Sequence, residues 1–133
     1  MLPFLFYFPA QFAIECCPGV RVESRTKKHN DLLKAHPKLF TNYFMEAGMV
    51  HGRHHYTSED GHFALAYNSA SGAWWIQPEV DRGGQRGFAF VRSTETCAHD
   101  VSIGERWSYA QGEWRVAGEE EVFVRCVSSS HVE

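Results

Sequence analysis

The stretch that decides the fold runs from His54 to Pro78 and reads HHYTSEDGHFALAYNSASGAWWIQP. Its Asp60-Gly61 pair lies between two segments that carry aromatic and apolar residues, which is a strong signal for a β-hairpin. Because side chains alternate between the two faces of a strand, three large residues of the second segment share one face: Phe63, Leu65 and Tyr67. A Ser-Ala-Ser-Gly turn then leads into another strand over 73–77, which Pro78 ends.

The same pattern of short apolar runs and turn residues continues through the chain after Thr41. Further runs occupy 88–92, 106–109, 113–116 and 121–127. About seven to nine short strands with turn signals between them predict an all-β fold, a small antiparallel β-sandwich or barrel. We expect three tryptophans to form its core, with two phenylalanines beside them: Trp74, Trp107 and Trp114, then Phe88 and Phe90.

One short helix at most is expected, in the basic stretch before this region. Asn30 is a suitable N-cap for Asp31–Ala35, and Pro37 would stop the helix. From Arg21 to Lys38 the charged residues are mainly Lys and Arg, whereas from Glu95 to Glu133 they are mainly acidic. Such opposed charge can steer a partner, although solvated loops and strands are the simpler interpretation.

Length and composition limit the class of protein. The chain has 133 residues, 44% of them hydrophobic, with 10 Phe, 5 Tyr and 4 Trp. This content fits one folded domain and excludes a disordered chain, and the sequence shows no collagen repeat, heptad repeat or apolar run of about 18 residues. The net charge of −3 argues against a general nucleic-acid binder. We expect a single domain over 15–133 behind a separate segment, 1–14.

That first segment reads MLPFLFYFPAQFAI and is apolar apart from Gln11. It has the apolar core of a secretory signal but no preceding Lys or Arg, and Pro3 and Pro9 would interrupt a helix. Its large apolar side chains need cover, either on the chain's own domain or on a partner or lipid interface, and we weigh the two equally. The interaction candidates here are Phe4, Leu5, Phe6, Tyr7 and Phe8.

The four cysteines suggest two disulfides. Adjacent residues of a strand point to opposite faces, so Cys16 and Cys17 are expected to reach different partners. We expect one of them to pair with Cys126 and the other with Cys97, which places the chain in an oxidising compartment, an organelle lumen or the extracellular space. The alternative is free, buried thiols in a reducing compartment, and the spacing is not that of a typical zinc site.

For the other candidate catalytic or metal-binding residues, a purely structural role is the simpler interpretation. Three histidines, His51, His55 and His62, could approach one another across the hairpin and bind Zn or Cu, but we favour surface histidines. The segment that contains His99, Asp100 and Ser102 has the residue types of a catalytic triad, yet sequence neighbours rarely form one. Four acidic residues could act on glycosides but are ordinary turn residues: Glu59, Asp60, Glu79 and Asp81.

The Trp74-Trp75 pair offers a further binding candidate. One ring of the pair must face the core and the other must face outward. An outward Trp75 next to Tyr56 or Tyr109 could stack on a sugar ring or anchor a protein partner. The alternative, given equal weight, is that a second β-layer or the apolar N-terminal segment covers this ring.

The order of aromatic and turn positions resembles a known module. The matching positions are Asn42-Tyr43-Phe44, Gly48, Gly52-Arg53, Tyr56, Leu65-Ala66-Tyr67, Gly72 to Ile76, Val101 to Trp107, Trp114, and Val122 to Cys126. They resemble a small β module, patterned in Tyr, Gly, Arg and Trp and bounded by Cys, that recurs in predicted proteins of algae and other unicellular eukaryotes. The resemblance covers about residues 16–127, implies a binding or assembly role, and transfers no catalytic residue.

We therefore expect a non-catalytic accessory subunit that docks on protein subunits of a larger, membrane-associated assembly, for example a photosynthetic or respiratory complex. The chain would be peripheral to the membrane, with possible contact to its surface, and would use no cofactor, metal or nucleic acid. The alternative is a secreted module that binds glycans or proteins through exposed Trp and Tyr. A small hydrolase ranks third.

Overall fold

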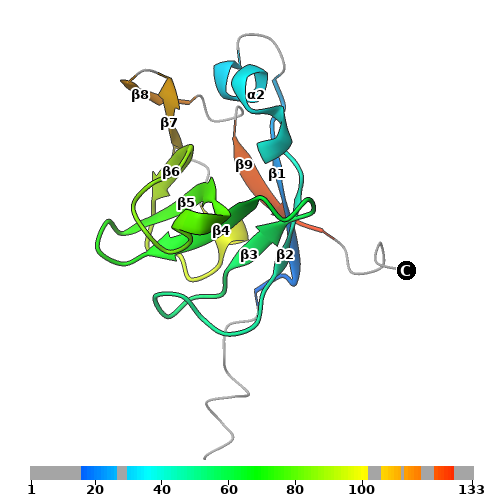
Figure 1. Ribbon diagram of the computed structural model, residues 1–133, viewed down its shortest axis with the longest axis vertical. Helices are drawn as coiled ribbons and strands as arrows, with labels where there is room; N and C mark the ends of the chain where they lie inside the picture. Colours follow the sequence, from blue (N-terminus) through cyan, green and yellow to red (C-terminus); the bar gives the residue numbers. More distant parts are fainter. Residues whose placement is uncertain (1–15, 27–29, 102–105, 112, 118–121, 128–133) are drawn as a thin grey trace, which may run out of the picture.

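A computed structural model describes residues 16–26, 30–101, 106–111, 113–117 and 122–127, and within them the chain forms nine strands and one α-helix (Figure 1). The strands are β1 (Gly19–Glu23), β2 (Asn42–Met45), β3 (Tyr56–Ser58), β4 (Phe63–Asn68), β5 (Ala73–Pro78), β6 (Ala89–Arg92), β7 (Ser108–Gln111), β8 (Glu113–Val116) and β9 (Phe123–Cys126). The helix α2 spans Asp31–Ala35, and short 3₁₀ turns occupy η1 (Pro37–Leu39), η2 (Glu79–Asp81) and η3 (Ala98–Asp100).

All nine strands belong to one antiparallel sheet with the order β8-β7-β6-β5-β4-β3-β2-β1-β9. Strands that follow one another in the chain are neighbours from β1 to β8, and β9 then returns to pair with β1. The sheet curls into a half-barrel, so the expected small antiparallel all-β fold is confirmed. The region 1–14 and Ser102 lie outside the described residues.

The hairpin signal in the sequence is confirmed by the strand register. Tyr56 of β3 lies opposite Leu65 of β4, and Tyr67 lies opposite Trp74 of β5. The β4–β5 pair is the longest in the sheet, with registered partners from Phe63–Pro78 to Asn68–Ala73. The Tyr56–Leu65 and Tyr67–Trp74 pairs face the core, whereas the alternate pair Ala66–Trp75 faces the other side of the sheet.

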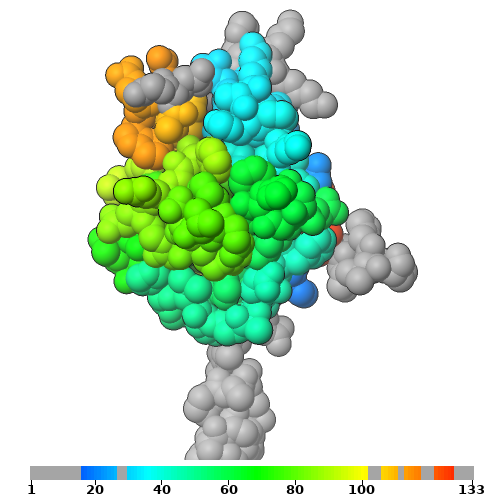
Figure 2. Space-filling model, in the orientation of Figure 1, coloured from blue at the N-terminus to red at the C-terminus, as the bar shows by residue number. Residues whose placement is uncertain are grey.

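The core lies inside the curl of the sheet. Trp74 is 0% exposed and belongs to the same core cluster as Tyr43, Tyr56 and Trp107. Three short elements contribute buried residues to the same core: Leu32 from α2, Leu39 from η1 and Ala98 from η3. Trp74 and Trp107 are core residues as expected, and Phe88 packs against the core as a partly buried residue. In Figure 2, α2 (cyan) and the β7–β8 hairpin (orange) stand at one end of the body formed by β3–β6 (green).

The helix begins where the sequence indicates. The Asn30 side-chain oxygen accepts a hydrogen bond from the Leu33 backbone N–H at 3.0 Å, which satisfies one of the unpaired donors of the first turn. The Asn30 amide also donates to Ser24 Oγ at 2.8 Å, so this cap ties the helix to the end of β1. No helix in the described part of the chain has the length and apolarity needed to cross a membrane.

Candidate functional site

The four cysteines form two disulfides, Cys16–Cys97 and Cys17–Cys126. This is the predicted arrangement, in which the adjacent cysteines take different partners. The Cα atoms are 5.3 Å apart in the first pair and 5.7 Å apart in the second, both within the usual disulfide range. The bridges join residues 81 and 109 positions apart, so they connect the start of the described chain to the beginning of η3 and to the end of β9. Two such bonds are compatible with an oxidising compartment.

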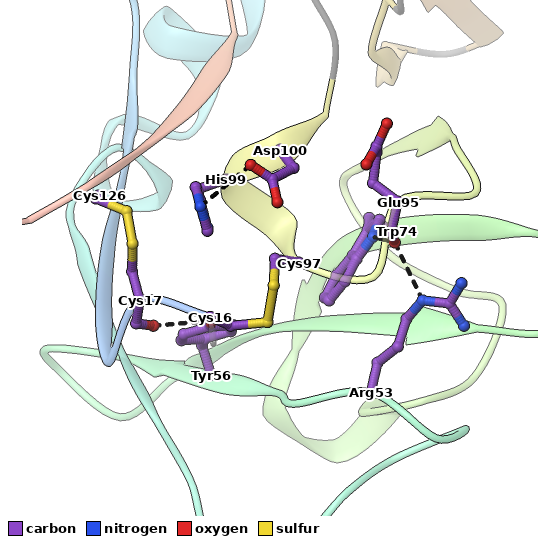
Figure 3. The surroundings of a disulfide bond; sticks show 10 residues. All are labelled: Cys16, Cys17, Arg53, Tyr56, Trp74, Glu95, Cys97, His99, Asp100 and Cys126. Atoms are coloured by element: carbon purple, nitrogen blue, oxygen red, sulfur yellow. Dashed lines mark hydrogen bonds and ion pairs between the residues drawn. A yellow bond between two sulfur atoms is a disulfide. The ribbon is translucent and has the colours of Figure 1, made fainter. Parts of the chain in front are cut away.

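Buried side chains hold both disulfide segments in place (Figure 3). The Tyr56 hydroxyl donates to the Cys17 carbonyl at 3.0 Å. On the other side, Trp74 Nε1 and Arg53 Nε each donate to the Glu95 carbonyl at 3.1 Å, two residues before Cys97. Burial raises the pKa of Tyr56 to about 12, so its hydroxyl stays protonated and remains a donor at neutral pH.

His99 lies between the two disulfides, in the turn η3 (Figure 3). Its Nε2 is 3.2 Å from Asp100 Oδ1, and its Nδ1 is buried and has no hydrogen-bond partner among the described residues. One ring nitrogen and the sulfurs of Cys17 and Cys126 all lie within 4.8 Å of one another. We call these residues, with Cys16 and Cys97, the cysteine cluster. The His99–Asp100 pair considered in the sequence is therefore real, while its third member, Ser102, is not described.

A second polar cluster forms where the 46–55 and 79–87 loops meet, and we call it the loop junction. The Arg82 guanidinium donates to both carboxylate oxygens of Glu79 and, at 2.6 Å, to His55 Nδ1. His55 Nε2 donates to the Ala47 carbonyl at 3.1 Å, so both ring nitrogens have partners. An open cavity of about 340 Å³ adjoins this network and is lined by Glu46, Ala47, His55, Thr57, Gly61, Glu79 and Arg82.

His51 links the same two loops to the β4–β5 turn. Its Nδ1 lies 2.8 Å from Ser69 Oγ, and its Nε2 lies 2.8 Å from the Gly83 carbonyl. Its backbone φ of 51° is in the left-handed region, a strained conformation that these hydrogen bonds support. With Nε2 donating to the Gly83 carbonyl, Nδ1 accepts from the Ser69 hydroxyl. These two hydrogen bonds give His51 a structural role, in which it holds the loops together.

The three histidines suggested as weak metal ligands are not brought together. Both ring nitrogens of His51 and of His55 are hydrogen-bonded, while His62 is exposed and its ring lies edge-on to Phe63. A metal ligand needs a free lone pair on a ring nitrogen, and these contacts occupy it. Within the described ranges, the groups whose geometry could hold a metal all contain His99.

The acidic residues have roles in turns and ion pairs. Asp60 accepts hydrogen bonds from the His62 backbone N–H and from Ser58 Oγ, and these bonds lower the pKa of its carboxyl. A general acid for glycoside hydrolysis needs the opposite shift. Glu59 accepts from Thr41 Oγ1 at 3.0 Å, and Glu79 pairs with Arg82.

An aromatic group covers the convex face of the sheet over β5, β6 and β8. The Trp75 ring lies 4.8 Å from Phe90 and 6.0 Å from Trp114, and the Phe90 and Trp114 rings lie 4.9 Å apart. Trp75 does face away from the core, but only 5% of it is exposed because these rings cover it. The expectation that Trp114 is a core residue is wrong, since it is 51% exposed. Trp75, Phe90 and Trp114 with the neighbouring Val116, 66% exposed, form what we call the aromatic patch.

Two residues at these sites escaped the sequence reasoning. Arg82 was not singled out, although the Asp81-Arg82-Gly83-Gly84 sequence is the kind of turn that can fold an Arg back onto a neighbouring loop. The size of Trp114 suggests a core residue, but the structure places it on the edge strand β8. His55, which binds Arg82, and the rings that contact Trp114 come from distant parts of the chain and are not visible in a local pattern.

Comparisons with models of known protein families, with curated proteins and with solved structures find no match to this chain. The resemblance to the β module of unicellular eukaryotes therefore stays a prediction.

Proposed function

We propose that the chain is a non-catalytic binding domain that docks on a protein partner through the aromatic patch, as an accessory subunit of a larger assembly. The observation that supports this most is the half-exposed Trp114 ring, which is fixed edge-on against Phe90 and Trp75. An aromatic side chain that is already ordered loses little conformational entropy on binding, and Trp is among the residues most enriched at energetic centres of interfaces.

The surroundings of the patch fit a protein partner. Val116 lies on the same face as Trp114 and adds apolar area, and Arg92 lies with its guanidinium 5.2 Å from the Phe90 ring. An apolar centre with an exposed cation at its rim is the usual anatomy of a protein interface. The patch also sits beside β8, an edge strand of the sheet whose four residues are all exposed.

The finer proposal is that the assembly is membrane-associated, for example a photosynthetic or respiratory complex. It rests on the apolar sequence of residues 1–14 and on the resemblance described above. Deleting residues 2–12 tests it. We expect the shortened chain to fold and to keep its protein partner but to leave the membrane fraction, and retention in that fraction would argue against the membrane part of the proposal.

Glycan binding is the second candidate, and the pairing of an exposed Trp114 with Arg92 around Phe90 favours it. A sugar ring stacks on an indole face while its hydroxyls accept hydrogen bonds from a guanidinium. A glycan array probed with the oxidised chain separates the two candidates. Saturable binding to one glycan class that is lost in Trp114→Ala would favour the secreted glycan-binding module over the accessory subunit.

The main test compares Trp114→Ala with Phe44→Ala. Both residues are aromatic, are partly exposed and belong to strands, but Phe44 lies on β2, which is six positions away from the Trp114 strand β8 in the sheet. We expect Trp114→Ala to weaken association of the purified chain with its native assembly by about 30-fold or more, which corresponds to about 2 kcal/mol. Phe44→Ala should bind like the unchanged chain. Equal binding by both variants would contradict the proposed docking surface.

A further inference from the structure

We propose that the chain, once its Cys17–Cys126 disulfide is reduced, binds one zinc ion through the sulfurs of Cys17 and Cys126 and a ring nitrogen of His99. These three ligand atoms already lie within 4.8 Å of one another. A tetrahedral zinc ion with Zn–S bonds of about 2.3 Å and a Zn–N bond of about 2.0 Å needs separations of about 3.5–3.8 Å between its ligands. Side-chain rotations can supply the remaining movement.

His99 has the hydrogen bonding of a metal ligand. Its Nε2 faces Asp100 Oδ1 at 3.2 Å, so the carboxylate favours the tautomer with the proton on Nε2. The lone pair is then on Nδ1, which is buried and has no partner among the residues described here. A carboxylate that accepts from one imidazole nitrogen while the metal binds the other is the common arrangement at zinc sites. Asp100 is thus a positioning residue for this site.

The ligands stay together when the Cys17–Cys126 bond opens. Cys16 is the neighbour of Cys17, and Cys97 lies two residues before His99, so the Cys16–Cys97 disulfide connects these two ligand segments. The third ligand, Cys126, is opposite Val20 in the β1–β9 ladder. The Cys16–Cys97 disulfide and the β1–β9 pairing therefore keep the three ligands together after the Cys17–Cys126 bond is reduced.

The two disulfides differ in how easily a reductant reaches them. Cys17 and Cys126 are both partly exposed, whereas in the other disulfide Cys16 is partly exposed but Cys97 is fully buried. Attack on a disulfide sulfur requires access, so a small dithiol should open Cys17–Cys126 first. The thiolate attack transfers two electrons: the dithiol becomes a cyclic disulfide, and Cys17 and Cys126 become thiols.

Zinc binding then displaces the two thiol protons to solvent, and the Zn²⁺ ion with two thiolates and a neutral imidazole forms a site with no net charge. Water fills the fourth position. Zinc would join the β1 and β9 segments in the reduced chain as the disulfide does in the oxidised chain.

The test uses the full chain with a phosphine reductant, because dithiols themselves bind zinc. Reduction is limited to two thiols per chain, counted by thiol titration, and metal is then removed with a chelator. Cobalt(II) serves as a spectroscopic probe for zinc. We expect one cobalt per chain, with a thiolate-to-cobalt charge-transfer band and the visible bands of tetrahedral coordination, and we expect one equivalent of zinc to bleach them.

Three variants and one control make the result specific. The double variant C17S/C126S keeps His99 and, after reduction, the same number of thiols, and it should show no charge-transfer band. His99→Ala should lower zinc affinity by more than 100-fold, and Asp100→Asn by about 10- to 100-fold. His62→Ala, at an exposed histidine on the β3–β4 turn, should leave affinity unchanged.

Three results would overturn the proposal. Cobalt binding by C17S/C126S equal to that of the unchanged chain would assign the metal to other residues. Affinity that does not depend on His99 would indicate binding by exposed thiols alone. If the reduced chain loses its β-type circular dichroism and zinc does not restore it, the site does not exist in the folded protein.

Discussion

The two edge strands of the sheet, β9 and β8, differ in how they are stabilised and in what they expose to solvent. At one end β9 is bonded to the start of β1 by Cys17–Cys126, and Arg125 makes a two-pronged ion pair with Glu23 across the two strands, at 2.8 and 2.9 Å. At the other end β8 pairs only with β7 among the described strands, and Trp114 and Val116 face solvent. Charge and a covalent bond stabilise the first edge, while the second displays apolar side chains.

This difference indicates where binding would take place. Exposed edge strands invite pairing with other chains, so proteins commonly protect them with charge or cover. The β9 edge has such protection. Glu113 and Arg115 also put charge on one face of β8, but the apolar Trp114 and Val116 on its other face would be a liability unless they serve an interaction. We therefore expect substitutions at the β9 edge to affect stability and substitutions at the β8 edge to affect binding.

Removing the Cys17–Cys126 disulfide should have the largest effect on the free energy of unfolding. In the oxidised chain the Cys16–Cys97 bond already shortens the loop that Cys17–Cys126 closes to about 30 residues, and the chain-entropy model gives about 3.7 kcal/mol of stabilisation for such a loop, since it restricts the unfolded chain. We expect C17S/C126S to lose about 3–5 kcal/mol of unfolding free energy, measured by urea denaturation of the oxidised protein. The variant should unfold at a lower urea concentration, and its unfolding free energy should depend more steeply on urea, because the unfolded chain becomes less restricted and exposes more surface. A loss below about 1 kcal/mol would show that β9 is held mainly by its pairing with β1.

Two tryptophans provide the next comparison. Trp74 is fully buried at the centre of the sheet, so Trp74→Ala should cost about 3–5 kcal/mol of unfolding free energy. Trp114 is half exposed, and Trp114→Ala should cost about 1 kcal/mol or less, mainly through its contacts with Phe90 and Trp75. Thermal unfolding of the two variants measures both values. A large loss of stability in Trp114→Ala would make this residue structural and weaken the proposed docking surface.

The sequence predicts the middle of the sheet well and its ends less well. The β3–β4–β5 region follows from alternation and an Asp-Gly turn, which are local properties. The opposite orientation of adjacent residues predicts that Cys16 and Cys17 take different partners, while the choice between Cys97 and Cys126 for each of them stays open in the sequence. The helix cap at Asn30 is local too. These features need no knowledge of distant contacts, and the structure confirms each of them.

The strand β1 was missed for a physical reason. Val20 and Val22 alternate with Arg21 and Glu23, which is a strand pattern, but the surrounding positive charge suggested a solvated loop. Its stability comes from pairing on both sides, with β2 and with β9, which is distant in the sequence. The loop junction and the contact of His99 with the cysteines are also tertiary, since Arg82 meets His55 across 27 positions.

The smallest expected effect on stability comes from the Glu23–Arg125 ion pair at the β9 edge. The hydrogen bond from Arg125, followed by the charges of Arg125 and Arg21, lowers the pKa of Glu23 below its ordinary value near 4.5, although partial burial opposes the shift. A carboxyl with a lowered pKa in the folded state binds its proton more weakly there than in the unfolded chain. Its contribution to stability is therefore fully present above about pH 4.5 and is lost as the pH falls through the lower folded value.

Glu23→Gln should remove this pH dependence and cost under about 1 kcal/mol at neutral pH, because Arg125 is half exposed and solvent screens the pair. Denaturation by urea at a series of pH values from neutral to about pH 3 measures it. Asp60→Asn is the control, because the pKa of Asp60 is also lowered but its partners lie in the β3–β4 turn, away from both edges. If the Glu23→Gln and unchanged chains lose stability in parallel below pH 4.5, the Glu23–Arg125 pair does not stabilise the β9 edge and the disulfide alone distinguishes the two ends.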